Sequence, residues 1–375
     1  MTTDEKLRRQ LADELKAGGH LRTRPWRDAV EAVPRQEFLR GGYFEQVPGS
    51  VPTAWRPVLP DSPGWLERCY TNESLVTQIA GTIVPTDIRG EIMRAPTSSS
   101  TMPNLVVRML EDLQVGDDQR VLEIGTGTGY STALMCHRLG DERVTSIEVD
   151  QDVSARARTA LGACGYFPNL VVGDGLAGYK DGATYDRVVA TCGVLDVPRQ
   201  WIEQTRPGGI VLATVCGWLY ASELARLTVA EDGTARGRFL GGQISFMLAR
   251  PQLPPALGML PDLDDGDERP ARLGVDVLDD WTARFVAQIA APRAQRISLP
   301  RDDRTEHVLL DVAGEAWAAL WQDGEQWMVR QGGTVRIWDA IEDHLGRWRA
   351  DGAPALDRFE IAVTSDGQTV TWPSS

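Results

Sequence analysis

The sequence predicts an α/β protein with a doubly wound parallel sheet, an N-terminal helical and loop extension, and a C-terminal α+β domain. Three observations support this fold class. From residue 120 onward, short apolar runs alternate with helical patterns of about a dozen residues, which is typical of a parallel sheet. A Gly-x-Gly-x-Gly turn separates the first apolar run from the first helix of this region. A segment rich in Pro, Gly and Asp, residues 251–272, indicates a linker before a further domain.

The N-terminal region predicts two helices and two irregular segments. Residues 5–16 repeat leucine at helical spacing and end at Gly18-Gly19, and residues 26–33 form a second helix closed by Pro34. Residues 43–63 contain five prolines, which favours a loop-rich arm. Residues 97–104, Thr-Ser-Ser-Ser-Thr-Met-Pro-Asn, are expected to form a hydroxyl-rich loop that leads into a helix over 105–113.

The central region supplies the predicted sheet. Strands are expected at residues 121–124, 144–149, 170–172, 185–191 and 210–215. Helices are expected at residues 131–139, 153–164 and 198–205. Two late strands, residues 224–229 and 245–248, are expected to pair antiparallel around the Asp232-Gly233 turn.

The C-terminal region predicts helices over 277–290 and 338–348, with short strands around Val308, Trp317, Trp327, Phe359 and Val370. It contains seven of the twelve tryptophans. Burial in a core is the simpler explanation, and a tryptophan-lined peptide groove is the alternative. The predicted domains are therefore an extension (1–95), a core (96–250), a linker (251–272) and an accessory domain (273–375).

Composition limits the possible partners and compartments. The net charge of −14 over 375 residues disfavours nucleic acid and anionic membranes as partners. We expect no signal peptide, because residues 1–16 are charged, and no membrane span, because no apolar run reaches about 20 residues. Five cysteines without a Cys-x-x-Cys pair indicate reduced thiols in a cytoplasm, and four scattered histidines predict no metal site.

The glycine turn at Gly125, Gly127 and Gly129 allows several ligands. A phosphate-binding P-loop requires Lys-Ser/Thr, which is absent here, and a dinucleotide turn requires a small residue where Tyr130 stands. An S-adenosylmethionine turn fits what remains, and a turn without ligand is the alternative. The cofactor-binding residues predicted at the turn are Glu123, Gly125, Thr126, Gly127, Thr128 and Gly129.

Ligands of an open parallel sheet bind at the carboxyl ends of its strands, so later strand ends supply further candidates. Glu148 is placed to accept ribose hydroxyls, and the alternative is a solvated acid. Asp174, followed by Gly175, is placed to accept the adenine amino group, and an ordinary turn is the alternative. Thr191 and Cys192 end the fourth strand near the expected methyl group. No histidine is placed to activate Cys192 as a nucleophile, so packing explains it better.

Several motifs occur together in one order. They are Val33-Pro34-Arg35, Phe38-Leu39, Tyr70-x-Asn72-x-x-Leu75, residues 101–104, residues 121–129, Gly173-Asp174-Gly175, residues 185–188 and Arg206-Pro207-Gly208-Gly209. Over residues 30–250 this set resembles the protein-L-isoaspartate O-methyltransferases, a class I, Rossmann-like family of S-adenosyl-L-methionine-dependent carboxyl O-methyltransferases. The resemblance implies S-adenosyl-L-homocysteine as product. It also implies a substrate-orienting hydroxyl at Thr101, with Ser100 and Ser99 as further catalytic candidates and Ser98, Met102, Pro103, Asn104 and Cys192 near the substrate.

The departures from the family pattern point to a narrower branch. The interval from Tyr70 to Thr101 is longer, the loop reads Ser-Ser-Ser-Thr-Met-Pro-Asn, and more than a hundred residues follow the core. These features resemble homologues from ribosomal peptide (RiPP) maturation, such as graspetide and lanthipeptide systems. Those homologues methylate an aspartate of a modified precursor peptide, and the ester then cyclises to an aspartimide.

The expected chemistry needs no general base, because a carboxylate is already ionised at pH 7. Thr101 and Ser100 would orient that carboxylate. Three rival functions differ in substrate or in kind: repair of isoaspartyl residues in damaged proteins, methylation of a small-molecule carboxylate, and a non-catalytic scaffold. The intact turn, Glu148 and Asp174 argue against the scaffold.

Overall fold

The computed structural model describes residues 2–301 and 304–374. The chain divides into two compact units, and neither is contiguous in sequence. The first unit comprises residues 1–191 and 198–212, and the second comprises residues 192–197 and 213–375. Strands β8 (Tyr185–Val194) and β9 (Thr205–Cys216) each begin in the first unit and end in the second.

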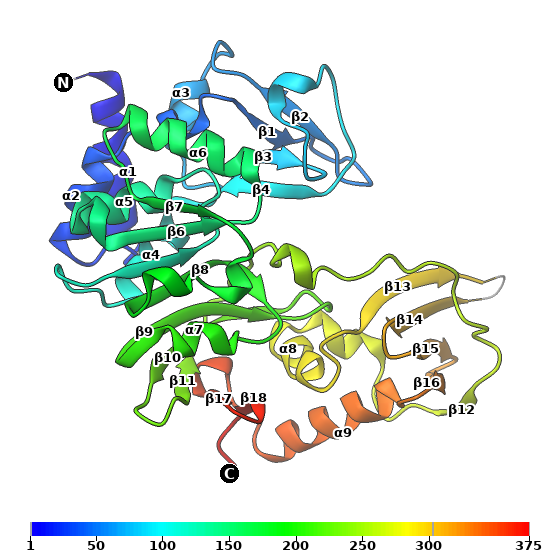
Figure 1. Cartoon of the computed structure of the whole chain (residues 1–375). Coiled ribbons are helices and arrows are strands. Elements are labelled where there is room, and N and C mark those ends of the chain that lie inside the picture. The colour runs from blue at the N-terminus through cyan, green and yellow to red at the C-terminus, as the bar shows by residue number, and fades with distance from the viewer. Residues whose placement is uncertain (1, 302–303, 375) are drawn as a thin grey trace. The chain divides into compact units, whose positions relative to one another are not determined.

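The first unit begins with two predicted helices, both confirmed, α1 (Thr3–Ala17) and α2 (Arg24–Ala32). Thr2 starts α1 in a capping box, in which its side chain accepts from the Glu5 N–H and the Glu5 carboxylate accepts from the Thr2 N–H. The helix buries Leu11, Ala12 and Leu15. It packs on α2, which in turn packs on α5 (Tyr130–Leu139), as Figure 1 shows.

A four-stranded antiparallel sheet follows where irregular segments were expected. Its strands, in the order β2-β1-β3-β4, are β2 (Trp55–Val58), β1 (Tyr43–Gln46), β3 (Leu75–Ile79) and β4 (Pro96–Ser100). The loop predictions for 43–63 and 97–104 are therefore wrong at these strands. Pro57 is tolerated because β2 lies at the sheet edge. Phe44, Val76 and Ile79 form the sheet's own small core, which the proline-rich sequence did not reveal.

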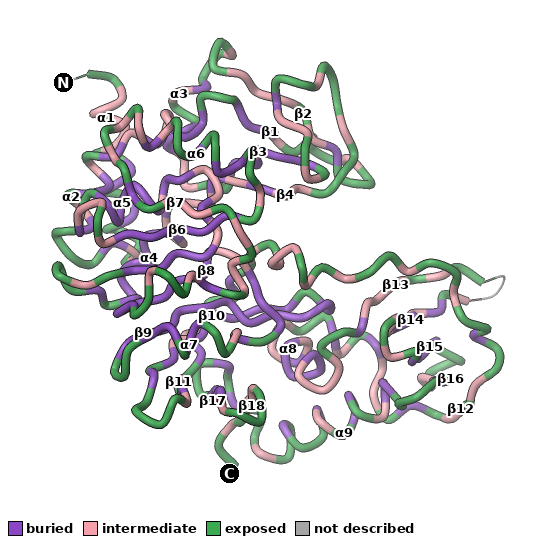
Figure 2. Tube along the Cα trace, in the orientation of Figure 1, coloured by how far each residue is buried: buried purple, intermediate pink, exposed green. Residues whose placement is uncertain are grey.

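The predicted parallel sheet is confirmed. Its strands β5 (Val121–Ile124), β6 (Val144–Glu148) and β7 (Asn169–Val172) pair in parallel with one another and with β8, in the order β8-β5-β6-β7. Its further helices are α4 (Pro103–Asp112), α6 (Gln151–Ala163) and α7 (Arg199–Glu203), and α3 (Trp65–Arg68) lies in the extension. Strands β5 and β6 are buried along their whole length, as Figure 2 illustrates for β6. The carboxyl ends of β5, β6, β7 and β8 therefore share one edge.

The second unit is largely antiparallel. One set of strands runs β10 (Ser222–Val229), β11 (Ala235–Phe239), β17 (Glu360–Thr364) and β18 (Gly367–Thr371). A five-stranded sheet has the order β12 (Asp267–Pro270), β16 (Gln326–Gly333), β15 (Ala316–Asp323), β14 (Thr305–Asp311) and β13 (Gln295–Pro300). Helices α8 (Trp281–Ala290) and α9 (Ile337–Ala350) pack on each other.

Three expectations for this unit need correction. The partner of β10 is β11, whereas residues 245–248, expected to be a strand, form only an isolated bridge. Residues 251–272, expected to be a linker, contribute strand β12 to the five-stranded sheet. The chain passes between the two units within β8, after residue 197 and within β9, and not at residue 250.

The tryptophans of the second unit support the core interpretation. Trp317, Trp321, Trp338 and Trp348 are buried. Trp317 packs with Val308, Leu310 and Leu263 in the core of the five-stranded sheet.

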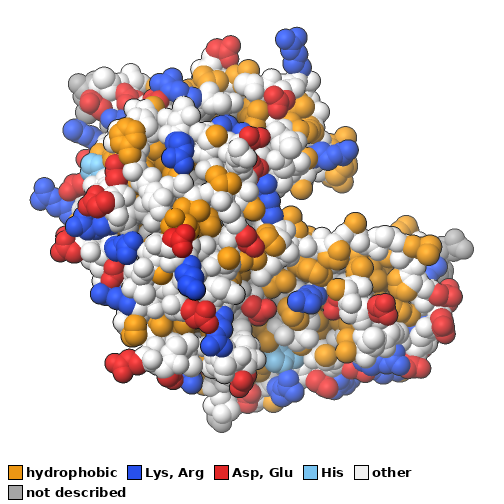
Figure 3. Space-filling view, viewed as in Figure 1, with side chains coloured by type: hydrophobic (Ala, Val, Ile, Leu, Met, Phe, Trp, Pro, Cys, Tyr) orange, Lys and Arg blue, Asp and Glu red, His pale blue; other side chains and the backbone are white. Residues whose placement is uncertain are grey.

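Short 3-10 helices complete the described chain: Arg35–Leu39, Pro85–Asp87, Asp141–Arg143, Gly175–Ala177, Lys180–Gly182, Arg250–Gln252, Val275–Asp279 and Leu356–Arg358. Within residues 2–301 and 304–374, no helix has the length and apolar character that a membrane span requires. On the face drawn in Figure 3, acidic and basic side chains are interspersed rather than gathered by sign.

Candidate active site

The glycine turn between β5 and α5 has a backbone that side chains would not allow. Gly125, Gly127 and Gly129 have φ values of +94°, +54° and +92°. A Cβ on Gly125 would lie 2.7 Å from the Thr191 Oγ1 atom. The Thr191 hydroxyl donates to the carbonyl of Gly125, and at 3.1 Å to that of Ile124. Thr191 therefore holds the turn against the end of β8.

The carboxylate of Glu123 is turned into the protein rather than toward the turn. The residue is 0% exposed, and it accepts hydrogen bonds from the hydroxyls of Ser131, Thr132 and Ser146. Burial raises the pKa of Glu123, against the opposing effect of these three hydroxyls. The sequence predicts a cofactor contact for Glu123, but in the structure its carboxylate links β5, α5 and β6.

Glu148 ends β6 and supports the turn from the other side. Its carboxylate accepts from the Gly127 N–H at 2.9 Å and from the Asp150 N–H at 3.1 Å, and the residue is 8% exposed. Each carboxylate oxygen carries a second lone pair, so these bonds leave capacity for ligand hydroxyls. Thr126 is buried, and its hydroxyl bonds Ser146, whereas Thr128 is half-buried in the turn.

The end of β7 supplies the next candidates. Asp174 is exposed, and its Oδ1 atom accepts from the Leu176 N–H at 2.9 Å. A Cβ on Gly175 would lie 2.6 Å from the Ile124 Cγ2 atom, so glycine is required for this close approach. Cys192 is half-buried, carries no disulfide and belongs to the second unit.

The hydroxyl-bearing segment is strand β4, and its side chains alternate between two faces. Ser98 and Ser100 are buried, with Ser100 only 1% exposed and its Oγ atom accepting from Arg35 Nε at 3.3 Å. Ser99 and Thr101 are half-buried on the other face. The expectation that Ser100 touches the substrate is therefore not supported, because its hydroxyl faces the interior. Ser99 and Thr101 remain the candidates.

Strand β4 lies next to the glycine turn. A Cβ built on Gly127 would be 3.6 Å from the Ser99 carbonyl oxygen. The Gln78 side chain on β3 donates to Asp150 Oδ2 at 3.1 Å and accepts from the Thr97 hydroxyl at 2.9 Å. The predicted cofactor turn and the predicted substrate segment thus lie next to each other in the first unit.

The residues after Thr101 are anchored by the segment before β3. The Met102 N–H donates to Ser74 Oγ at 3.0 Å, and the Asn104 N–H donates to Asn72 Oδ1 at 2.9 Å. Pro103 begins α4, so a helix N-terminus follows Thr101 directly. The partial positive charge of such a terminus favours a carboxylate nearby.

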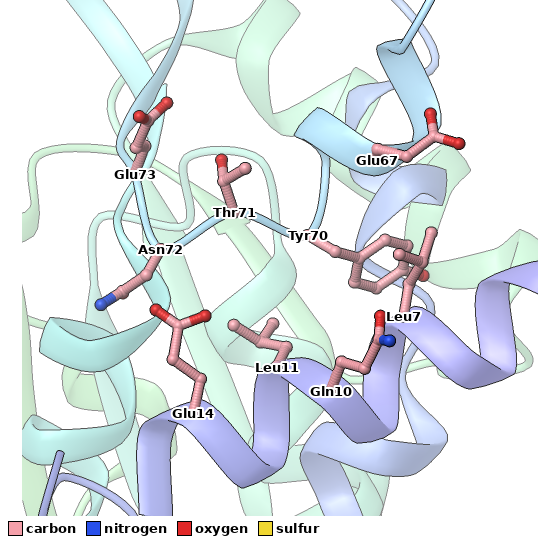
Figure 4. A pocket seen from close by; sticks show the side chains of 9 residues that line it. All are labelled: Leu7, Gln10, Leu11, Glu14, Glu67, Tyr70, Thr71, Asn72 and Glu73. Carbon is pink, nitrogen blue, oxygen red and sulfur yellow. The ribbon is translucent and has the colours of Figure 1, made fainter. Parts of the chain in front are cut away.

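A hollow of about 450 Å³ opens beside this anchoring segment. Figure 4 shows side chains of α1, among them Glu14, on one wall and Glu67, Asn72 and Glu73 on the other. One of its lining residues, Asn72, is also the acceptor for the Asn104 N–H.

Sequence reasoning gave no role to Arg35, Gln78 or Asp150. The only signals were the place of Arg35 in the Val-Pro-Arg motif and of Asp150 at the start of α6, where its side chain accepts from the Asp152 and Val153 N–H groups. In the described part of the chain, no three His, Cys, Asp or Glu residues lie close enough to hold a metal ion.

The site fits an adenosyl cofactor on structural grounds. A side chain at position 125 would collide with Thr191, and one at position 175 would collide with Ile124. Gly127 leaves the space before the Ser99 carbonyl open. Acidic side chains stand at the ends of β6 and β7, where ribose and adenine groups are bound in open parallel sheets. The residues expected to hold the cofactor are Gly125, Gly127, Gly129, Glu148, Asp174 and Gly175.

Comparisons with known proteins identify the family. The family described as "Protein-L-isoaspartate(D-aspartate) O-methyltransferase (PCMT)" matches residues 76–239. A protein-L-isoaspartate O-methyltransferase from Methanopyrus kandleri is 32% identical over 249 residues, 64% of this chain and 92% of the relative. A relative of the same name from Thermococcus onnurineus is 27% identical over 219 residues, 58% of this chain and 90% of its own.

The fold comparison extends to the second unit. A solved structure named protein-L-isoaspartate O-methyltransferase covers 97% of this chain and 99% of its own, with a TM-score of 0.56 and 20% identity. Both units therefore have counterparts in that fold. The match to almost the whole length of the Methanopyrus relative establishes the family and, with it, the cofactor S-adenosyl-L-methionine. The chain belongs to the protein-L-isoaspartate O-methyltransferase family and is an S-adenosyl-L-methionine-dependent protein carboxyl O-methyltransferase.

Proposed function

We propose that the chain methylates the side-chain carboxylate of one aspartate in a ribosomally made precursor peptide, and that the ester then cyclises to an aspartimide. The observation that carries the site assignment is the position of β4, whose Ser99 carbonyl faces Gly127 of the cofactor turn. Thr101 follows on the half-buried face of this strand, at the start of α4. A carboxylate held there would lie in front of the turn.

The protein's part in the reaction is to position and desolvate the nucleophile. When bound, S-adenosyl-L-methionine supplies an electrophilic methyl group. The Thr101 hydroxyl would donate a hydrogen bond to one carboxylate oxygen and leave the other free, and the N-terminus of α4 would favour the negative charge. The cofactor and the substrate would together fill the space between β4 and the glycine turn, and their binding would displace water from the nucleophile. No base is needed, because the carboxylate is already ionised at pH 7.

The cyclisation belongs to the peptide itself. The backbone nitrogen of the residue after the aspartate attacks the ester carbonyl, the C–N bond forms, and the methoxy group leaves with the N–H proton as methanol. A methyl ester loses its alcohol far more readily than an ionised carboxylate loses oxide, so methylation is the activating step. This step needs no group of the protein.

Two features support a peptide of defined sequence. The hollow beside the 67–73 segment is lined by Asn72, which also accepts from the Asn104 N–H, and we infer that it would receive a side chain of the peptide substrate. Three glutamates line it, Glu14, Glu67 and Glu73, so a basic or polar neighbour would fit best. The second unit gives no support to a peptide of defined sequence. A solved structure named protein-L-isoaspartate O-methyltransferase covers nearly the whole chain, so the second unit is not peculiar to a peptide-maturation enzyme.

Repair of isoaspartyl residues in damaged proteins is the second candidate. It is favoured by the names of the relatives, one of which is matched over 92% of its length. An isoaspartyl carboxylate and an aspartyl carboxylate present the same nucleophile, so the geometry at Thr101 supports both.

Mass spectrometry of two substrates separates these functions. One is a generic isoaspartyl peptide, and the other is the modified precursor peptide encoded beside the gene, each incubated with S-adenosyl-L-methionine. Gain of one methyl group followed by net loss of one water, seen with the precursor alone, supports peptide maturation. Methylation of the isoaspartyl peptide alone contradicts it and establishes repair.

A further inference from the structure

Arg35 is a cation buried beneath the candidate substrate segment. It begins the 3-10 helix that follows Pro34, and it is 0% exposed. Its hydrogen bonds run to two separate segments of the chain. Nη1 donates to the carbonyls of Cys69 at 3.0 Å and Thr71 at 2.9 Å, and Nη2 donates to that of Glu73 at 2.9 Å. Nη2 also donates to the carbonyls of Ser100 and Thr101, both at 3.2 Å, and Nε donates to Ser100 Oγ.

All six hydrogen-bond acceptors of the guanidinium are neutral oxygens. Burial lowers the pKa of Arg35, because removing the guanidinium from water disfavours its charged form. A buried cation without a directly bonded carboxylate is expensive unless its donors are satisfied. The carbonyls satisfy them only while residues 69–73 and 100–101 keep their present conformation. The charge therefore makes these two backbone segments depend on each other.

Thr101 needs this support because the β-ladder ends before it. The last residue pair between β3 and β4 is Leu75 with Ser100. The Thr101 carbonyl, one residue further, is held by Arg35 instead. The guanidinium carbon also lies 5.8 Å from the centre of the Tyr130 ring, in the first turn of α5 after the glycine turn. Arg35 thus contacts both halves of the site.

We propose that Arg35 is a positioning residue for methyl transfer: it fixes the Thr101 backbone, and through it the hydroxyl that orients the substrate carboxylate in front of the glycine turn. The inference rests on the proposed role of Thr101. It does not depend on which peptide is the substrate, because an aspartyl or an isoaspartyl carboxylate would require the same placement.

Arg187 offers a matched control. It is 8% exposed, and burial lowers the pKa of this arginine too. It also donates to backbone carbonyls, those of Leu113, Gln114 and Asp186. It lies near the start of β8, at the end of the parallel strands opposite to the site. Loss of Arg187 should therefore cost stability as loss of Arg35 does, without moving Thr101.

The test compares Arg35→Lys, Arg35→Met and Arg187→Met in the full chain. Lysine keeps the charge but lacks the planar fork of five donors. Below the melting temperatures of all three, we expect both Arg35 variants to lose on the order of 100-fold in kcat, a loss typical of a misplaced reacting group. Calorimetry should show their affinity for S-adenosyl-L-methionine within about twofold of wild type, because no cofactor contact is lost. Arg187→Met should keep its kcat.

Hydrogen exchange gives a readout that does not require a known substrate. In Arg35→Lys, we expect faster exchange for the amides of residues 100–102, 104 and 72–74, with those of β5 and β6 unchanged. Unchanged exchange in residues 100–102 and 104 would overturn the proposal, and so would an Arg35→Met variant no slower in kcat than Arg187→Met. If wild-type protein methylates neither peptide, the proposed function fails, while the exchange result still decides whether Arg35 orders Thr101.

Discussion

At the scale of single residues, two glutamates with similar sequence surroundings have different roles. Glu123 and Glu148 both lie in strands that are buried along their whole length. In such strands the alternation of polar and apolar residues is lost, so the sequence does not show which way a side chain points. Glu123 is enclosed by three hydroxyls, whereas Glu148 supports the turn at the strand end. The position of Glu148 at the strand end was predictable, and the inward direction of Glu123 was not.

The first prediction separates substrate orientation from cofactor binding. Thr101→Ala removes the hydroxyl proposed to orient the carboxylate, so kcat should fall by about 10²-fold with cofactor affinity unchanged. Glu148→Ala removes an acceptor that holds Gly127, so affinity for S-adenosyl-L-methionine should weaken by roughly tenfold or more. Steady-state kinetics and calorimetry measure the two effects. Weaker cofactor binding in the Thr101 variant would contradict this division.

The second prediction concerns the stability that Glu123 provides. Glu123→Ala leaves the hydroxyls of Ser131, Thr132 and Ser146 without their common acceptor, so the free energy of unfolding should fall by about 3 kcal/mol. Glu123→Gln keeps an acceptor and nearly the same volume, and it should lose less. Urea unfolding measures both variants. Equal losses would mean that the carboxylate charge, rather than the acceptor, matters.

At the scale of elements, strands with a local sequence signal were predictable. Strands that are held in place by distant residues were not. The strands β5, β6, β7 and β8 each contain β-branched or other apolar residues and are bounded by turn residues, and all four were predicted. Strand β4 is Pro-Thr-Ser-Ser-Ser, which predicts a loop. It is held by pairing with β3 and by the buried Arg35, neither of which is a local signal. The sequence showed that β4 precedes the glycine turn along the chain, but it did not show that the two lie next to each other.

The third prediction is a pH dependence that arises in α9. Burial, together with the Arg347 charge, lowers the pKa of His344 to about 4. The ring packs edge-on against Trp372, and its Nδ1 atom lies 2.7 Å from the Arg347 guanidinium. Above the ordinary histidine pKa of about 6.5, both folded and unfolded chains are neutral at this residue. As pH falls from there toward 4, only the unfolded chain gains the proton, so the folded state loses stability.

The measurement for His344 is urea unfolding of wild type and His344→Gln at pH 7.5 and pH 4.5. Many carboxylates also titrate in this range, but they contribute equally to both proteins and cancel in the difference. We expect the variant to gain stability relative to wild type at the lower pH. A difference that does not change between the two pH values would show that His344 titrates normally.

At the scale of the whole molecule, the two units do not follow the sequence in blocks. The predicted division at residues 251–272 assumed that a composition change marks a boundary. The structure instead pairs β11 with β17, which lies more than a hundred residues later, and places both in the second unit. Pairing over such a distance leaves no local pattern, because each strand needs only an alternating or apolar run of its own. A division into contiguous segments was all that composition could suggest, because the pairing that joins distant segments into one unit has no local sequence pattern.

The last prediction follows from this interleaving: a chain shortened to residues 1–272 should not fold, although the sequence would place its end in a linker. Removal of β17 exposes the backbone edge of β11, where Ala235 to Arg238 now pair with Glu360 to Val363. Phe239, which is fully buried, also loses the Phe285 ring, whose centroid lies 5.3 Å away. An unpaired strand beside an exposed aromatic residue promotes aggregation.

We expect the shortened chain to aggregate and to lack a cooperative melting transition, as measured by size-exclusion chromatography and circular dichroism. Co-expression of residues 273–375 as a separate chain is the control, because it restores β17 and Phe285 without restoring the covalent link. Recovery of soluble protein with that fragment would show that the missing strand is the cause. A monomeric 1–272 chain with a melting curve like that of the full chain would contradict the prediction, and it would make the segment after residue 272 an independent accessory domain.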